Sequence, residues 1–238
     1  MKKILLTIVL AAVLWTIMFS PWTAPHVNFW WMMTGSACAL SIISSLFAPG
    51  WWKSVNFAPR EILLGIAIAV ALWGVFWIGD KLSQLMFDFA RPQVDTIYGM
   101  KDGESPWVLT VLMLFLIGPA EEIYWRGYVQ KSLSARWSPN VGFVVTTLIY
   151  ALVHAGSFNF MLTMAALVAG AAWGVLYRFF PNHFAAAVAA VHFLDFSVTD
   201  DHFYHPGSIQ LTAVAADKFF NLHYSSSVTQ KPRGPMIR

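Results

Sequence analysis

Two adjacent glutamates and an arginine interrupt an otherwise apolar stretch, LIGPAEEIYWRGYV at residues 116–129. Glu122 and Arg126 are four residues apart with the acid first, which is the favourable order for an ion pair on one face of a helix. Glu121 is turned by about 100° from Glu122 on a helix, so its carboxylate cannot share that arginine equally. We therefore expect Glu122 to be structural and Glu121 to be free to react.

Two histidines and an aspartate lie in other apolar segments. TTLIYALVHAG carries His154, and AAVAAVHFLDF carries His192 and Asp195. Polar side chains within a bilayer are costly and turn away from lipid, so we expect these residues to meet the two glutamates in one polar cavity. A carboxylate with imidazoles can activate water and stabilise an oxyanion. Glu121, His154 and His192 are also the donor types that bind zinc or another divalent ion, and their spacing does not decide between the two chemistries.

Other chemistries find little support in the chain. The HExxH pattern of helical zinc proteases, the GxSxG nucleophile elbow and the phosphate-binding glycine loop are absent from the sequence. The single cysteine, Cys38, excludes an internal disulfide and a multi-cysteine metal site. A simpler interpretation of Glu121, Glu122 and Arg126 is that they mark where a membrane span ends beside interfacial aromatic residues.

The composition requires a membrane around these residues. Of the 238 residues, 58% are hydrophobic and only 11% are charged, which is more apolar surface than one soluble core can bury. The net charge of +3 contains no basic run, so nucleic acid is not an expected partner. We predict an all-α, polytopic transmembrane bundle of about seven helices, with an eighth or re-entrant segment left open. The expected spans are 4–20, 28–48, 62–79, 107–120, 139–156, 158–179 and 182–198.

The remaining segments are expected to lie in water. Residues 80–106 hold five of the 12 acidic side chains and predict a long loop. The first span fits a retained helix better than a secretory signal, and the placement of lysines and arginines favours a cytoplasmic amino terminus. We divide the chain into amino-terminal helices and loop (1–104), a core that carries the polar motifs (105–198) and a polar, amphipathic tail (199–238).

The polar motifs resemble those of a known family. EEIYWR matches the EExxxR motif of the CPBP family, which comprises type II CAAX prenyl endopeptidases and bacteriocin-processing or immunity membrane proteins. YALVH resembles the family's FxxxH motif, with Tyr150 in place of phenylalanine. HFLD resembles the third motif, H-x-x-x-N/D, although Asp195 comes one residue early, which turns its side chain by about 100° on a helix. The resemblance covers about residues 105–198, in the order of the family's motifs.

The resemblance implies a role for each matching residue. Glu121 resembles the glutamate that activates the attacking water, and Glu122 with Arg126 resembles its supporting pair. His154 and His192 resemble the histidines that bind water and stabilise the oxyanion, and Asp195 stands where the family has a hydrogen-bonding residue. Family members are described both as metalloproteases and as glutamate proteases, so the resemblance leaves the cofactor open.

We therefore expect an intramembrane endopeptidase of the bacterial inner membrane that cuts a peptide or membrane-associated protein. Two other classes compete with this prediction. A scaffold or bacteriocin-immunity protein would use the same cavity for binding alone. A proton-coupled or ion-coupled transporter would use the acids and histidines as a relay, but the chain has no inverted repeat and few helices.

Overall fold

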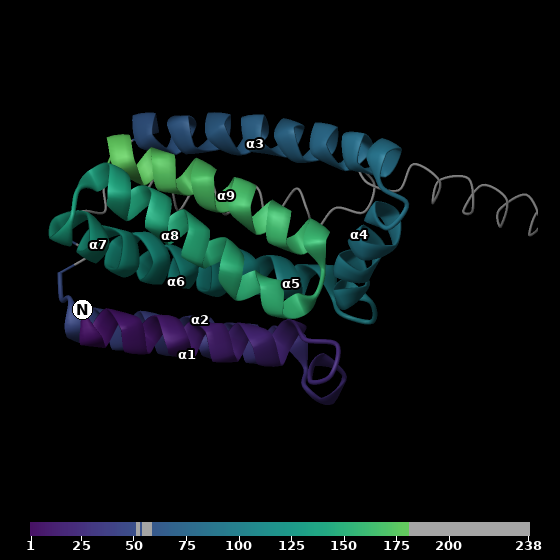
Figure 1. The fold of residues 1–238 in the computed structure, drawn as a ribbon, viewed down its shortest axis with the longest axis horizontal. Coiled ribbons are helices and arrows are strands. Elements are labelled where there is room, and N and C mark those ends of the chain that lie inside the picture. The colour runs from purple at the N-terminus through teal and green to yellow at the C-terminus, as the bar shows by residue number, and fades with distance from the viewer. Residues whose placement is uncertain (51–52, 54–58, 181–238) are drawn as a thin grey trace, which may run out of the picture. The chain divides into compact units, whose positions relative to one another are not determined.

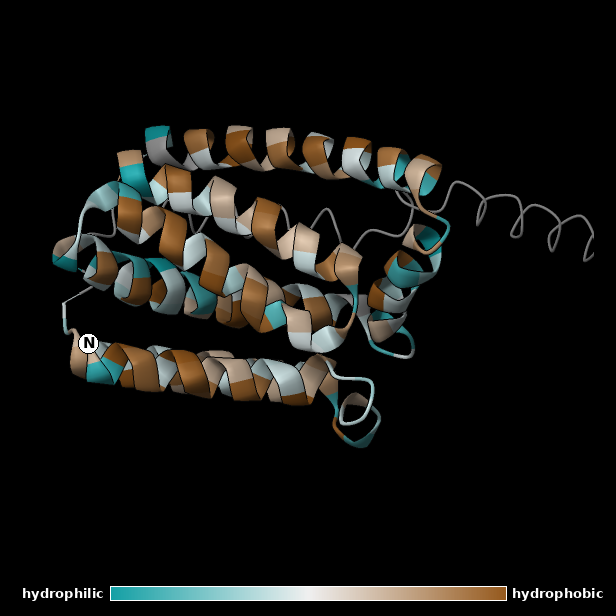
Figure 2. Cartoon of the chain, viewed as in Figure 1, coloured by the Kyte–Doolittle hydropathy of each residue, from teal (hydrophilic) through white to brown (hydrophobic). Residues whose placement is uncertain are grey.

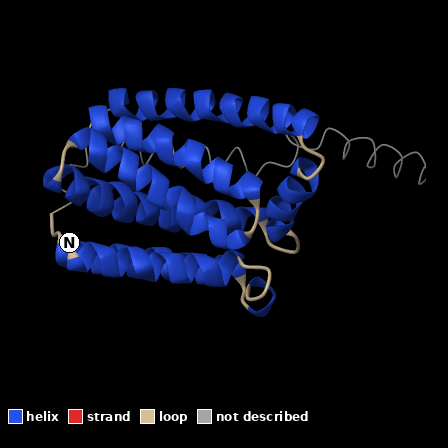
Figure 3. Ribbon diagram, in the orientation of Figure 1, coloured by secondary structure: helices blue, strands red, loops and turns tan. Residues whose placement is uncertain are grey.

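The computed structural model describes residues 1–50, 53 and 59–180, and all regular secondary structure in this part of the chain is helical (Figure 3). Six helical segments within it are long and apolar enough to cross a bilayer. The predicted all-α membrane bundle is thus confirmed. The expected seventh helix at 182–198 and the tail at 199–238 lie outside the described residues.

The first two spans form an antiparallel pair. Helix α1, Lys2–Phe19, packs against α2, Phe29–Phe47, as expected for spans near 4–20 and 28–48 (Figure 1). Asn28 begins α2 by accepting a hydrogen bond from the Trp31 backbone nitrogen at 3.1 Å, which satisfies one free donor of the first turn. The polar turn between the helices contains the short 3-10 helix η1, Ala24–His26.

Helix α3, Pro59–Met86, continues well beyond the span expected at 62–79. Asp80, the first residue of the expected loop, accepts a hydrogen bond from Gln84 Nε2 at 2.7 Å and lies 3.7 Å from the Lys81 ammonium. Because these polar groups find partners within the helix, the helix does not end with the apolar run.

Most of the expected loop at 80–106 is helical, so that prediction was wrong. After α3 ends, α4 covers Ala90–Tyr98 and the 3-10 helix η3 covers Gly99–Lys101. An ion pair between Arg91 and Asp95, 2.9 Å apart and four residues apart in sequence, supports α4. Hydropathy colouring shows α4 as a largely hydrophilic helix, unlike the spans (Figure 2).

The fourth span, Trp107–Arg136, carries the two glutamates and changes its helical type along its length. It consists of α5 (Pro106–Leu112), the π-helix η4 (Met113–Ile117), α6 (Gly118–Glu122), the π-helix η5 (Ile123–Gln130) and α7 (Lys131–Arg136). Pro119 has no backbone N–H, so an unbroken α-helical ladder is not available there. The glutamates thus lie within a 30-residue span, between two π-helical segments, and not at its end.

Two closely packed helices complete the described bundle. Helix α8, Pro139–His154, and α9, Phe160–Phe179, each begin with a capping side chain, Ser138 and Asn159. The 3-10 helix η6, Ala155–Ser157, and Phe158, with a left-handed φ of 55°, make the tight turn between them. A Cβ at Gly142 would collide with the Ser134 backbone, so this glycine allows α7 and α8 to approach closely.

Candidate active site

The Glu122–Arg126 pair is at the centre of the buried polar region. Glu122 Oε1 lies 2.8 Å from Arg126 Nη1, and both residues are 1% exposed. The ion pair expected from their four-residue spacing is therefore present. Two charges this deep in an apolar bundle are tolerated because each offsets part of the other's desolvation cost.

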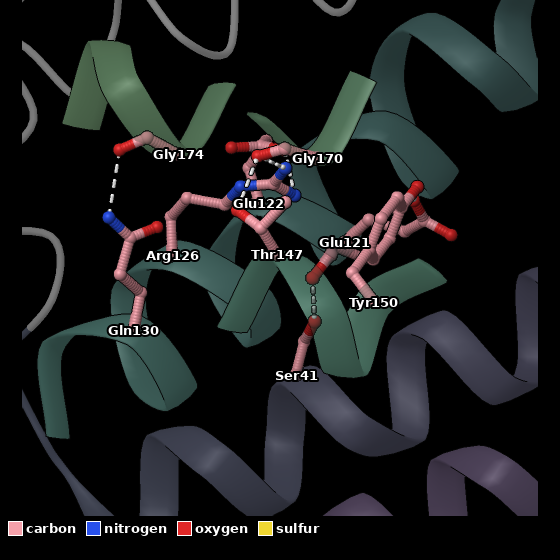
Figure 4. Close-up of polar contacts among 10 residues, drawn as sticks. Ser41, Glu121, Glu122, Arg126, Gln130, Thr147, Tyr150, Gly170 and Gly174 are labelled. Carbon is pink, nitrogen blue, oxygen red and sulfur yellow. Dashed lines mark hydrogen bonds and ion pairs between the residues drawn. The ribbon is translucent and has the colours of Figure 1, made fainter. Parts of the chain in front are cut away.

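Helix α9 supplies backbone oxygens to the same region (Figure 4). The Gly170 carbonyl accepts hydrogen bonds from Arg126 Nη2 at 3.4 Å and from the Thr147 hydroxyl at 3.3 Å. One turn further along, the Gly174 carbonyl accepts a hydrogen bond from Gln130 Nε2 at 2.8 Å. Arg126 and Gln130 thus connect the fourth span to α9 through backbone carbonyl oxygens. A pattern of side-chain types in the sequence does not predict such acceptors.

The Glu121 carboxylate has different partners from those of Glu122. The Tyr150 hydroxyl donates a hydrogen bond to Glu121 Oε2 at 3.1 Å. Glu121 Oε1 is buried and has no hydrogen-bond partner among the described residues. Among the described residues, one oxygen of this carboxylate is therefore held by a side chain and the other is not.

His154 lies one helical turn beyond Tyr150, and its two ring nitrogens are both occupied. Nε2 is 3.1 Å from the indole Nε1 of Trp15, and Nδ1 is 2.7 Å from the Tyr150 carbonyl oxygen. An indole N–H can only donate, so Nε2 must be the acceptor and Nδ1 must carry the proton. In this arrangement His154 is a neutral imidazole in the Nδ1–H tautomer.

The polar region gathers the residues of the first two motifs. Tyr150 connects them, since its hydroxyl binds Glu121, its carbonyl binds His154 and its ring centroid lies 5.1 Å from the Arg126 guanidinium carbon. The other two predicted site residues, His192 and Asp195, lie outside the described residues, so their roles stay predictions.

The metal hypothesis needs a third protein ligand. Within residues 1–50, 53 and 59–180, no three His, Cys, Asp or Glu side chains are grouped as a metal site requires. The His154 ring nitrogens are also engaged by Trp15 and the Tyr150 carbonyl. The described part of the predicted Glu121, His154 and His192 set is therefore insufficient to bind an ion.

Several residues of this region were not predicted from the sequence. Ser41 of α2 donates a hydrogen bond to the Ala120 carbonyl at 2.6 Å, directly before the glutamates, and Trp15 of α1 binds His154. Neither residue has a sequence signal, because each is far along the chain from its partner. Tyr150 did have one, since a hydroxyl-bearing residue stands where the FxxxH motif has phenylalanine.

The fold and the site together define a class: a multi-pass helical membrane protein with a carboxylate, a guanidinium and an imidazole buried within its spans. Residues 103–196 match the family described as "Type II CAAX prenyl endopeptidase Rce1-like". This match to residues 103–196 supports membership of the CPBP family, which the motifs predicted. Such membership in turn supports CAAX-type intramembrane protease activity in general. Comparison with curated proteins and with solved structures gave no match.

Proposed function

We propose that this protein is an intramembrane endopeptidase in which Glu121 activates the water that attacks the peptide bond. The observation that carries the proposal is the asymmetry of the Glu121 carboxylate. Tyr150 holds Oε2, while Oε1 is buried and without a partner among the described residues. A carboxylate in this state can accept a proton from a water molecule held beside it.

The proposed reaction needs only water and the substrate. Glu121 Oε1 takes a proton from water as the water oxygen bonds to the peptide carbonyl carbon, and this step gives a tetrahedral oxyanion. The carbon–nitrogen bond then breaks, and the proton passes from Glu121 to the leaving amine. The products are a carboxylic acid and an amine, and the glutamate is regenerated as a carboxylate.

The remaining predicted residues assist this step in our proposal. Glu122 and Arg126 hold the helix around Glu121, and His154, His192 and Asp195 contribute hydrogen bonds to the water and the oxyanion. His154 can bind water through Nε2 only after the hydrogen bond that Trp15 donates to this nitrogen has broken. If a divalent ion such as zinc binds, Glu121, His154 and His192 would hold it, and it would make bound water more acidic.

The proposed substrate is a peptide or a membrane-associated protein, with or without a prenyl group. Glu121 and Glu122 lie within a membrane span, so the scissile bond must reach them from the bilayer or from a water-filled end of the bundle. Six spans fit a multi-pass integral membrane protein, and the bacterial inner membrane is our proposed location.

The test compares membranes that contain the wild-type protein with membranes that contain Glu121→Gln or no protein. Mass spectrometry of newly formed peptide termini detects cleavage of any substrate protein in the membrane. We expect new termini only with the wild type, because glutamine keeps the size of Glu121 but cannot take the proton. The same termini with Glu121→Gln, or none with the wild type, would overturn the proposal.

The same comparison distinguishes the endopeptidase from the alternative, a scaffold or immunity protein. Glutamine can still accept the Tyr150 hydrogen bond, so a protein that only binds a partner should keep its phenotype in the Glu121→Gln variant. Loss of new termini with full retention of membrane insertion supports the endopeptidase.

A further inference from the structure

We propose that Tyr150 is a positioning residue for Glu121, an inference that rests on the proposed function. Its hydroxyl holds Oε2 and so leaves Oε1 as the one oxygen that receives the proton from water. The FxxxH motif has phenylalanine at this position, so the hydroxyl is a feature of this chain beyond the motif.

The first observation is the hydrogen bond between these two side chains. The Tyr150 hydroxyl donates to Glu121 Oε2 at 3.1 Å, and the two residues come from different helices, α8 and α6. Rotation about the last side-chain bond of a glutamate exchanges its two oxygens, and a fixed donor on one oxygen opposes this exchange. The hydroxyl therefore selects which oxygen points to the water.

The second observation is that the Tyr150 ring is itself held on several sides. Its centroid lies 5.2 Å from that of Trp125 and 4.9 Å from that of His154, and the Arg126 guanidinium lies over it. On α9, a Cβ at Gly170 would lie only 3.0 Å from Tyr150 Cδ1. A ring packed this closely keeps its hydroxyl in one place.

These two observations show that the hydroxyl and the ring of Tyr150 make different contacts. Every packing contact named above involves the ring, which phenylalanine retains, whereas only the hydroxyl reaches Glu121. Tyr150→Phe therefore removes the proposed positioning contact and leaves the packing in place. Tyr177→Phe is a matched control, because Tyr177 is also partly buried, on α9, and makes no hydrogen bond that involves its hydroxyl within the described residues.

The kinetic test uses purified protein in liposomes and a quenched fluorescent peptide that spans a bond cleaved by the wild type but not by Glu121→Gln. We expect Tyr150→Phe to lower kcat roughly 10- to 100-fold, the value of one hydrogen bond to a charged group, while KM stays unchanged. Tyr177→Phe should keep the wild-type kcat. A wild-type kcat in Tyr150→Phe overturns the inference, and so does a rise in KM with no fall in kcat.

A second measurement does not depend on activity. Thermal unfolding in detergent of Tyr150→Phe, Glu121→Leu and the double variant forms a double-mutant cycle. A direct hydrogen bond predicts that the combined shift in unfolding midpoint is smaller than the sum of the single shifts. Additive shifts overturn the inference. Cleavage that persists in Glu121→Gln overturns the proposed function instead, so the two failures are distinguishable.

Discussion

Glu121 and Glu122 are adjacent in sequence, yet the structure gives their carboxylates different environments. Glu122 faces Arg126 at 2.8 Å, whereas Glu121 accepts a hydrogen bond from the neutral hydroxyl of Tyr150. The turn of about 100° between successive helical residues separates the two side chains, and the neighbouring helices then determine what each one meets. One carboxylate is neutralised by an ion pair, and the other keeps an oxygen without a partner among the described residues.

At the residue scale, Arg126→Met should destabilise the protein strongly. The substitution leaves Glu122 buried without its counter-charge, a change that typically costs about 3–5 kcal/mol. Chemical denaturation in detergent micelles measures the loss. The double variant Glu122→Leu with Arg126→Met removes both charges and should recover much of this free energy. An unfolding midpoint equal to that of the wild type in Arg126→Met would show that the pair does not stabilise the fold.

At the element scale, the site depends on α1, which precedes the family-matched segment. Trp15 is 1% exposed, donates to His154 of α8 and lies edge-on to Trp125 of the fourth span, with ring centroids 6.4 Å apart. Helix α1 packs against both α2 and α8. The first helix therefore stabilises the YALVH segment of α8 through a hydrogen bond and helix packing.

Trp15→Phe tests this support because it removes the indole N–H and keeps an aromatic ring. Interhelical hydrogen bonds in membranes contribute about 0.6 kcal/mol on average and up to about 1.7 kcal/mol. We expect a loss in this range, measured as a lower unfolding midpoint in detergent. Trp31→Phe is the control, since Trp31 is 69% exposed on α2. Equal shifts in the two variants would contradict a specific contribution from the Trp15–His154 bond.

At the scale of the whole molecule, six spans return the chain after α9 to the side of the membrane where it begins. Basic residues cluster at the ends and connections assigned to that side: Lys2, Lys3, Lys53, Arg60, Lys131, Arg136 and Arg178. The opposite side contains the end of α3 with Lys81, followed by α4 and its flanking acidic residues, with Arg91 and Lys101. By the positive-inside rule this distribution favours a cytoplasmic amino terminus, and the orientation itself stays a prediction.

Cysteine labelling tests this orientation in bacterial spheroplasts. In a Cys38→Ser background, a membrane-impermeant maleimide should label Asp102→Cys in intact spheroplasts and Ala135→Cys only after permeabilisation. Asp102 is exposed in the connection before the fourth span, and Ala135 is exposed beside Arg136 at the charged end of that span, so access depends on the side of the membrane. Labelling of Ala135→Cys alone in intact spheroplasts would reverse the orientation.

Most of the local organisation could be predicted from the sequence. Long uncharged runs located the described spans, and the spacing of Glu122 and Arg126 predicted their ion pair, because both signals depend on residues close along the chain. The same reasoning failed at 80–106, where charge and polarity suggested a loop. Side-chain pairs such as Asp80 with Gln84 and Arg91 with Asp95 are compatible with helix there.

Only the tertiary structure determined the surroundings of each catalytic candidate. The Tyr150 bond to Glu121, the Trp15 bond to His154 and the Gly170 carbonyl beside Arg126 join residues 29, 139 and 44 positions apart. Composition and helical period determined that polar residues must turn inward, since lipid cannot satisfy them. Which polar group each one meets depends on how the helices pack, and a linear pattern does not carry that information.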